Sequence, residues 1–337
     1  MSKNVTIKDI AAEAGVSIAL VSFVMNNRVE ADGKQKYRVN ENTRQRVLDI
    51  ARKLNYQPNS AARTLRKGRS LVIGVILSDI SNVFYGEIAR QMEGIAFKHG
   101  YTVLFGSSDE SPEKFDRIVR TFLDKGVEGF IVVPCEGAER SLRHVMNVGV
   151  PFVIIDRKDI DIPAPKIVLD NEGAMMNAVS ILAERGLRKI EMMSLDINVS
   201  SITGRENGFL NSMRNLGIPD DEIMIHRAPF AHVAEFTDKI LPDVVNGGAQ
   251  GLVFATNAMA IASIRKLSSM GVRVQKDIHL VGFDNSDVYD LFYPSIPHIS
   301  QPIDEICSMS FNYLKNLMDK EIEQRSKIIY LSGMVVR

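Results

Sequence analysis

Polar side chains that could bind a small molecule follow several short apolar segments of this chain. Asp79, Asn82 and Phe84 come after LVIGVIL, and Asp156 and Arg157 come directly after PFVII. Four further candidates follow later segments of the same kind: Asp170, Arg205, Asn257 and Asp284. Carboxylate, amide and guanidinium groups together donate to and accept from hydroxyl groups, so the set indicates a site for a small hydroxylated ligand such as a sugar or sugar derivative. Each of these side chains could instead cap a helix or order a loop.

Aromatic residues could add a stacking surface for such a ligand. The chain has no Trp, which is the side chain best suited to that task. Phe84, Phe230 and Tyr289 are the candidates that could replace it.

Enzymatic chemistry finds little support in the residue pattern. The six histidines show no HExxH spacing, and the chain has no GxSxG, GxxxxGK[ST] or strand-following GxGxxG motif. Cys135 and Cys307 are isolated thiols, which indicates buried small residues and not a redox pair. We therefore expect no catalytic residue, no metal and no cofactor.

The spacing of apolar residues after position 71 predicts alternating strands and helices. Strands are expected at LVIGVIL, TVLFGS, GFIVVP, PFVIID, KIVL, KIEMMSL, GLVFA and HLVGFD. Helices are expected around residues 83–99, 112–125, 138–147, 172–185, 203–216, 233–246 and 257–270. This alternation predicts an α/β core of two doubly wound parallel-sheet subdomains, with ligands beyond the carboxyl ends of the strands.

The first residues of the chain have a different pattern, typical of a helix-turn-helix. Thr6, with Asp9 three residues later, can cap a first helix, and Ser17 can cap a second. Gly15 suits the bend between them. The face of the second helix that is free to meet a partner carries Ile18, Ala19, Ser22, Phe23 and Asn26. Such helix pairs also occur in proteins that never contact DNA, so charge and the following segment must be considered.

Charge is distributed unevenly along the chain. The whole sequence has 41 basic and 41 acidic residues, yet residues 1–70 hold 14 Lys or Arg and only 6 Asp or Glu. A basic segment of this kind attracts the phosphates of DNA, although a solvated charged surface would show the same composition.

A third helix and a short helical segment follow. Asn40 can cap a helix over about residues 41–54, and Pro58 with Asn59 precedes SAARTLRK. That last segment is too short to be a stable helix alone, because isolated helices of this length are marginal in water. We expect it to order against a partner helix or DNA.

Residues 5–77 resemble the head, hinge and first strand of the lactose-repressor (LacI/GalR) family of bacterial transcription regulators. The matching strings are VTIKDIAAEAGVS, VS and N in VSFVMN, TRQRV, LNYQPNSAARTLR and SLVIGV. The resemblance implies that the second helix enters the major groove and that paired hinge helices enter the minor groove. Leu65 stands where the family places its intercalating leucine, and Ala62 stands where the two hinge helices touch. The residues implied to bind DNA are Thr6, Ser17, Ile18, Ala19, Ser22, Phe23, Asn26, Tyr56, Asn59, Ala62 and Leu65.

The resemblance extends to the core and implies an effector in a cleft between two lobes. Arg205 in RENGF and Asp284 in VGFDN match positions that hydrogen-bond the effector in this family. The expected domains are a head (1–58), a hinge (59–70) and an effector core (71–337). Within the core, the first subdomain is expected over about 71–167 and 301–325, and the second over about 168–298 and 326–337. The three crossings between them are expected near 167–170, 298–301 and 324–328.

Three departures from the family pattern affect specificity. Leu20 and Phe23 replace the polar readers usual in the second helix, so contact with thymine methyl groups is the readout left open. Asn257 replaces a more usual Asp, which leaves the effector class open, purines included. An insertion of about eight residues before Val39 could add phosphate contacts or be a solvated loop.

These observations predict a cytoplasmic, homodimeric transcription regulator, with repression favoured, that binds near-palindromic double-stranded DNA and a small effector. The chain shows no signal peptide, no apolar run long enough for a membrane and no leucine-heptad tail after the last strand. The alternative is a periplasmic-type solute-binding protein without DNA function.

Overall fold

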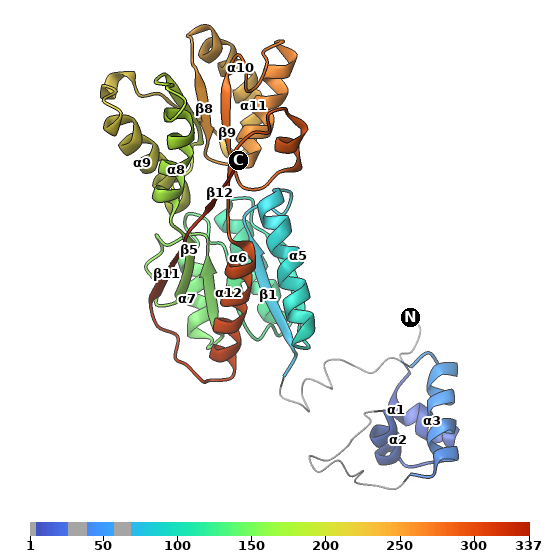
Figure 1. Ribbon diagram of the computed structural model, residues 1–337. Coiled ribbons are helices and arrows are strands. Elements are labelled where there is room, and N and C mark those ends of the chain that lie inside the picture. The colour runs from blue at the N-terminus through green and yellow to red at the C-terminus, as the bar shows by residue number, and fades with distance from the viewer. Residues whose placement is uncertain (1–4, 26–38, 57–68) are drawn as a thin grey trace. The chain divides into compact units, whose positions relative to one another are not determined.

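The computed structural model describes residues 5–25, 39–56 and 69–337 (Figure 1). The chain divides into two units, one up to Ser70 and one from Leu71 onward, and each is described by itself. Several predicted features lie outside the described residues: Asn26, the 28–38 insertion, and the hinge with Asn59, Ala62 and Leu65.

The described residues of the head form three helices, α1 (Ile7–Ala14), α2 (Ile18–Met25) and α3 (Glu41–Lys53). The predicted caps are confirmed. The Thr6 N–H donates to Asp9 Oδ2 at 2.8 Å, and the Leu20 N–H donates to Ser17 Oγ at 3.2 Å. Gly15 bends the chain between α1 and α2 with φ of 62°, a conformation that glycine adopts without strain.

The head also has its own hydrophobic core. Ile10, Val21 and Val47, one from each helix, are fully buried against one another. Lys53 Nζ lies 2.9 Å from Glu13 Oε1 and joins the end of α3 to α1. The apolar stripes predicted from the sequence therefore form the packed interior of a three-helix unit.

The first lobe of the core is a six-stranded parallel sheet in the order β11-β5-β4-β3-β1-β2. Helices α5 and α12 cover one face of this sheet, while α6 and α7 cover the other (Figure 1). The strands are β1 (Val72–Leu77), β2 (Thr102–Ser107), β3 (Phe130–Val132), β4 (Phe152–Ile155), β5 (Pro165–Leu169) and β11 (Lys327–Leu331). The helices are α5 (Val83–Lys98), α6 (Pro112–Asp124), α7 (Glu139–Asn147) and α12 (Ile303–Met318).

The second lobe is a six-stranded sheet in the order β12-β10-β9-β8-β6-β7, in which only β12 is antiparallel to its neighbour. Helices α8 and α9 lie on one side and α10 and α11 on the other (Figure 1). The strands are β6 (Ile190–Leu195), β7 (Ile225–Ala228), β8 (Gly251–Phe254), β9 (His279–Phe283), β10 (His298–Ser300) and β12 (Met334–Val336). The helices are α8 (Asn171–Ala183), α9 (Ser200–Asn215), α10 (Val233–Asn246) and α11 (Asn257–Ser269), with 3-10 turns η1 (Asp220–Glu222), η2 (Phe230–His232) and η3 (Asp287–Leu291).

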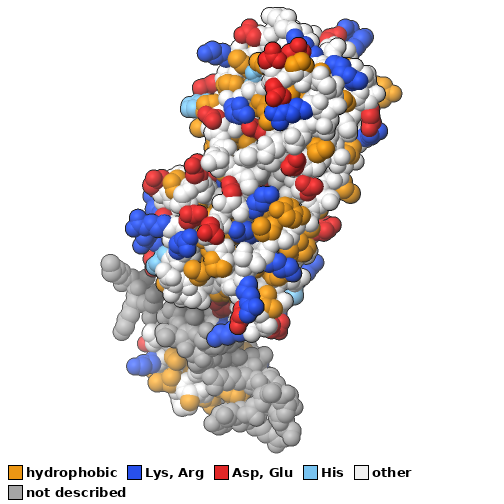
Figure 2. Space-filling view, turned by 90° about the vertical axis from the view of Figure 1, so that its left-hand side faces the viewer, with side chains coloured by type: hydrophobic (Ala, Val, Ile, Leu, Met, Phe, Trp, Pro, Cys, Tyr) orange, Lys and Arg blue, Asp and Glu red, His pale blue; other side chains and the backbone are white. Residues whose placement is uncertain are grey.

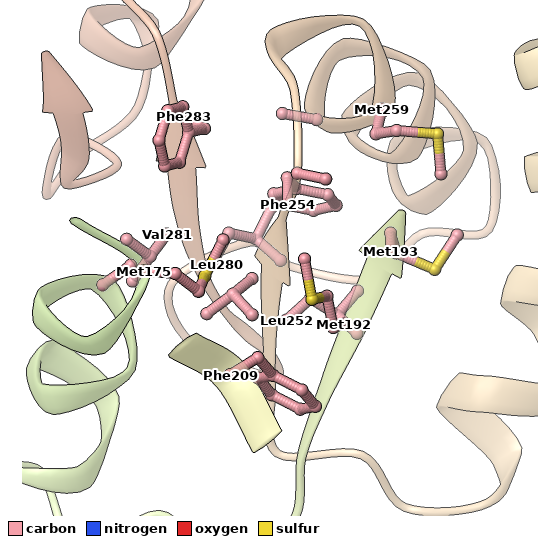
Figure 3. Packing of buried hydrophobic residues seen from close by; sticks show 14 of the residues in the cluster. Met175, Met192, Met193, Phe209, Leu252, Phe254, Met259, Leu280, Val281 and Phe283 are labelled. Atoms are coloured by element: carbon pink, nitrogen blue, oxygen red, sulfur yellow. The ribbon is translucent and has the colours of Figure 1, made fainter. Parts of the chain in front are cut away.

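The interior of the second lobe is rich in methionine and phenylalanine. The buried cluster of this lobe includes Met192 on β6, Phe209 on α9, Leu252 and Phe254 on β8, and Leu280 on β9 (Figure 3). All five are buried, so the lobe is a packed body whose strand ends can hold polar groups in place.

Every predicted strand and helix of the core is present, but the prediction was incomplete. It missed β7, β10, β11, β12 and α12. The four strands are short or lie at sheet edges, where apolar alternation is weak. Helix α12 carries a regular stripe that could have been recognised: Ile303, Ile306, Cys307, Phe311 and Leu314 are all buried.

The chain crosses between the lobes three times. It crosses at Asp170 after β5, between β10 and α12, and at residues 332–333 between β11 and β12. The first two crossings lie where they were predicted. The third prediction, near 324–328, was wrong because β11 pairs with β5 up to Leu331↔Leu169. Residues 327–331 and 168–169 therefore belong to the first lobe, whereas the prediction assigned them to the second.

On the face of the core seen in Figure 2, acidic and basic side chains alternate without a large area of one sign. None of the helices in the described part of the chain is long and apolar enough to cross a membrane.

Candidate effector cleft and DNA-binding head

A cleft with a cavity volume of about 50 Å³ lies where the carboxyl ends of the two sheets face each other. Both lobes contribute to its walls, as the fold class predicts. The first lobe supplies Ser78, Asn82, Phe84, Tyr85, Glu110, Asp156 and Arg157. The second lobe supplies Leu195, Ile197, Ser201, Ile202, Arg205, Phe230, Thr256 and Asp284, and Gln301 lies at the second crossing.

The first-lobe wall is a buried network of charged groups. Arg157, directly after β4, donates from Nη2 to Glu110 Oε1 at 2.5 Å and from Nη1 to Glu110 Oε2 at 2.8 Å. Its Nη1 also donates to the Pro134 carbonyl oxygen at 2.6 Å. Ser78 Oγ donates to the same Glu110 carboxylate. Two parallel bonds between a guanidinium and a carboxylate fix both groups in one plane.

Asp156 is the second carboxylate of this wall. It has φ of 69° and is 7% exposed. The Tyr85 hydroxyl donates to its Oδ2 at 3.1 Å, and Arg157 Nε lies 3.5 Å from the same oxygen. Burial and the neighbouring Asp156 carboxylate raise the pKa of the Tyr85 hydroxyl, so Tyr85 remains a hydrogen-bond donor at neutral pH.

Arg205 dominates the second-lobe wall. It lies on α9 between Gly204 and Gly208, and a Cβ at Gly208 would come within 2.3 Å of the Glu172 carbonyl oxygen on α8. The two glycines therefore let α9 approach α8 closely. The Arg205 side chain donates from Nε to Asn171 Oδ1 at 2.8 Å and from Nη1 to the Ala255 carbonyl at 2.5 Å, and it lies 3.8 Å above the Phe283 ring.

Asp284, directly after β9, faces the cleft next to Arg205. It has φ of 64° and is 3% exposed. Gln301 Nε2 donates to its Oδ1 at 2.6 Å. Burial raises the pKa of Asp284 above its ordinary value and the Asp156 charge adds to this, while Arg205, Gln301 and the Asn257 backbone N–H act in the opposite direction.

Six of the nine predicted effector residues line the cleft: Asn82, Phe84, Asp156, Arg157, Arg205 and Asp284. The other three do not, because their groups serve the local fold. Asp79 accepts from the Ser81 N–H at 2.9 Å, and Asp170 caps α8 by accepting from the Gly173 N–H at 3.1 Å. Asn257 is buried in the first turn of α11.

Two of the three aromatic candidates line the cleft, and the third does not. Phe84 and Phe230 line the cleft. Tyr289 is fully buried, and its hydroxyl donates to the Phe283 carbonyl at 3.2 Å, so its ring packs in the core and offers no surface to a ligand.

Sequence reasoning missed several polar residues of the cleft, above all Ser78, Tyr85, Glu110, Ser201 and Gln301. Ser78 follows β1 and Glu110 follows β2 within three residues, so the strand-end rule could have found both. Gln301 follows β10, a strand that the sequence pattern did not reveal.

Helix α2 of the head is exposed at its first two residues and half-buried or buried after them. Ile18 is 43% exposed and Ala19 is also exposed, while Ser22 and Phe23 are half-buried. Within the described residues of α2 there is no charged side chain. Tyr56 packs partly against the core of the head, and Thr6 and Ser17 lie at the starts of α1 and α2.

Metal and thiol chemistry have no evident place in the described part of the chain. Its residues form no group of three or more His, Cys, Asp or Glu that could hold a metal ion. Burial raises the pKa of Cys135 to about 11 and that of Cys307 to about 12, so both thiols stay protonated at neutral pH.

Comparison with known proteins agrees with both units. Residues 6–59 match the family model of bacterial regulatory proteins, lacI family. Residues 70–229 match the periplasmic binding proteins and sugar binding domain of LacI family, and residues 179–337 match a periplasmic binding protein-like domain. The chain is 30% identical over 319 residues to the transcriptional regulator RegA of Clostridium acetobutylicum, covering 94% of this chain and 93% of that one. The chain belongs to the lacI family of bacterial regulatory proteins.

Other relatives support the same assignment. The chain is 29% identical over 323 residues to RegA of Clostridium saccharobutylicum, covering 94% of this chain and 93% of that one. The fold matches the lac repressor dimer solved with operator and the anti-inducer ONPF, with a TM-score of 0.79, 24% identity and coverage of 99% and 98% of the two chains. The predicted family, fold class and role are confirmed: this family member is a DNA-binding transcription regulator and not an enzyme.

Proposed function

We propose that this regulator changes its affinity for operator DNA when a small hydroxylated effector, a sugar or sugar derivative, binds in the cleft between the lobes. The observation that carries the proposal is the set of polar groups from both lobes at the ends of the strands. Asp156 belongs to one lobe, and Arg205 and Asp284 belong to the other. A ligand that bonds to both sets stabilises one arrangement of the lobes over another.

The chemistry of the cleft supports a polyhydroxyl ligand. Arg205 uses Nε and Nη1 on Asn171 and Ala255, which leaves Nη2 for a ligand. Asp156 uses Oδ2 on Tyr85 and leaves Oδ1 as an acceptor. Phe84 and Phe230 supply apolar ring surface beside these groups. Planar polar groups next to aromatic rings fit a sugar ring, which has hydroxyls at its edge and C–H groups on its faces.

The crossings provide the mechanical link within the core. The Asp170 N–H donates to the Leu331 carbonyl at 2.8 Å, so the first and third crossings are joined by a backbone hydrogen bond. A change in lobe arrangement must rotate the chain at these points. Coupling of this kind typically amounts to about 1–3 kcal/mol, which changes operator affinity about 5–150-fold.

The DNA side of the proposal rests on the head. Helix α2, with Ile18 and Ala19 exposed, is the element expected to enter the major groove. We propose a homodimer that places two heads on two half-sites of a near-palindromic operator, since two-fold proteins bind two-fold DNA. Such a regulator acts in the cytoplasm, where the DNA is. A solute-binding protein without DNA function is not favoured, because residues 6–59 match the regulatory head.

The test is operator binding by the full-length protein with and without effector. An operator is first selected from genomic fragments, and its affinity is then measured by fluorescence anisotropy in the presence of sugars, sugar derivatives and nucleosides. We expect at least one compound to change the Kd for operator by about fivefold or more. If the protein binds no genomic fragment more tightly than random duplex DNA at moderate salt, the proposed function is refuted.

A further inference from the structure

Glu110 occupies the position on Arg157 that a negatively charged ligand would otherwise take. We propose that Glu110 determines the charge class of the effector: it excludes phosphorylated and carboxylated ligands and restricts the cleft to ligands without negative charge. This inference rests on the proposed effector role of the cleft. It concerns which ligands bind and not whether the protein binds DNA.

The contacts of Arg157 leave no room for an external anion. Its side chain is 4% exposed, and that of Glu110 is 11% exposed. Both terminal nitrogens of Arg157 point at Glu110, at 2.5 and 2.8 Å, and Nη1 also reaches the Pro134 carbonyl. Planar, two-pronged binding of this kind is how arginine recognises carboxylates and phosphates in ligands. Here the chain supplies the carboxylate itself.

The loop that carries Glu110 is held in an unusual conformation. Asp109 and Glu110 have φ of 50° and 57°, a region that non-glycine residues rarely adopt. Asp109 is anchored by Lys114 and by Ser107, whose hydroxyl donates to Asp109 Oδ1 at 2.7 Å. The turn directs Glu110 inward, where Ser78 also donates to it. Strained residues persist only where the surroundings hold them, and here the result is a carboxylate placed against Arg157.

The charges that line the cleft agree with this assignment. Three carboxylates, those of Glu110, Asp156 and Asp284, face two guanidinium groups, those of Arg157 and Arg205. Arg157 is matched by Glu110, and Arg205 lies close enough to Asp284 to favour its ionised form. An incoming anion would therefore meet a surplus of negative charge in a site largely withdrawn from water, where repulsion is strong.

Chemical rescue tests the proposal on the full-length protein. Glu110→Ala removes the carboxylate and leaves Arg157 facing a small void, which acetate can refill. Thermal unfolding of the wild type, E110A and E113A is followed as acetate or phosphate replaces chloride at constant ionic strength. Glu113 is the matched control because it lies three residues further along, in the first turn of α6, is exposed and does not line the cleft.

We expect E110A to be stabilised by acetate in a saturable manner, with an apparent Kd at least about tenfold below that of the wild type or E113A. Equal stabilisation of all three proteins, or none in E110A, would overturn the proposal. If E110A fails to fold even in acetate, the thermal unfolding of E110Q is followed as phosphate replaces chloride. The glutamine amide keeps the shape of the Glu110 side chain and removes its charge. No gain of phosphate binding in E110Q over wild type then counts against the proposal. Failure of the proposed function would show separately, as loss of operator selection by the wild type.

Discussion

Asp156 and Asp284 hold equivalent positions in the two lobes. Each directly follows the third strand of its sheet, counted from the edge strands β11 and β12, and the two residues share a left-handed conformation with φ of 69° and 64°. The Asp156 charge contributes to raising the pKa of Asp284, so the two carboxyl groups interact across the cleft. A ligand that donates hydrogen bonds to both would relieve this repulsion and favour the closed arrangement.

The substitution Asp284→Asn should stabilise the core at neutral pH. A raised pKa means that the folded protein binds the Asp284 proton more tightly than the unfolded chain does. The stability linked to this group is therefore fully present at low pH and is lost as the pH rises above the ordinary carboxyl value. We expect D284N to have a higher free energy of unfolding than the wild type at pH 7, because the amide has no charged form that burial penalises. The advantage should vanish as the pH falls toward 4 and below.

Urea unfolding across this pH range measures the effect. Asp290→Asn is the control, because Asp290 is an exposed carboxylate on η3 and its replacement should change stability by less than about 0.5 kcal/mol. A wild-type protein that equals D284N at every pH would contradict the prediction.

The substitution Arg205→Lys should weaken effector binding by about 100-fold while the protein remains folded. Lysine cannot reproduce the planar contacts to Asn171 and Ala255 together with stacking on Phe283. Isothermal titration with the identified effector measures the loss. Arg214→Lys on the same helix is the control, since Arg214 pairs with Asp220 at the surface. Unchanged affinity in R205K would remove Arg205 from the binding site.

The substitution Gly208→Ala should destabilise the core by about 1–3 kcal/mol. The added methyl would approach the Glu172 carbonyl oxygen at 2.3 Å, which forces α9 away from α8. Gly94→Ala is the matched control, because a Cβ at Gly94 on α5 meets no atom within 4 Å. That change should raise stability by about 0.5–1 kcal/mol through its helix propensity. Similar unfolding midpoints for both variants would contradict the close packing of α8 on α9.

Cys135 and Cys307 should resist alkylation in the folded protein. Because burial raises their pKa values to about 11 and about 12, almost no thiolate is present at pH 8. Mass spectrometry after iodoacetamide treatment at pH 8 should detect no modification without denaturant and two carbamidomethyl groups with it. Rapid modification of either thiol in native buffer would be inconsistent with the packing described.

Replacing thymine by uracil in the selected operator should weaken binding. The exposed residues Ile18 and Ala19 on α2 cannot hydrogen-bond a base edge with their side chains, so contact with thymine methyl groups is the readout available to them. Anisotropy titrations with uracil at one position at a time would locate the methyl groups that matter. Equal affinity for every uracil-containing operator would show that specificity comes from elsewhere.

Local features of this protein were readable from its residues alone. Thr6, Ser17 and Asn40 cap the helices that they were expected to cap, since a cap depends only on the next few residues. The eight apolar segments from LVIGVIL to HLVGFD became strands because long apolar runs must be buried wherever they are placed. The family strings of the head and the motifs around Arg205 and Asp284 placed the chain in its family.

Tertiary structure decided how distant residues are combined. Glu110 meets Arg157 from 47 positions away, and Gln301 meets Asp284 from 17. Strand β11 belongs to the first lobe because it pairs with β5. The residues of β11 by themselves do not predict this pairing. Asp79, Asp170 and Asn257 have the chemistry of ligand-binding residues but serve turns and helix starts. Such partnerships depend on which strand ends and helices the fold brings together, and a hydrogen bond or ion pair forms only where that packing places both of its atoms.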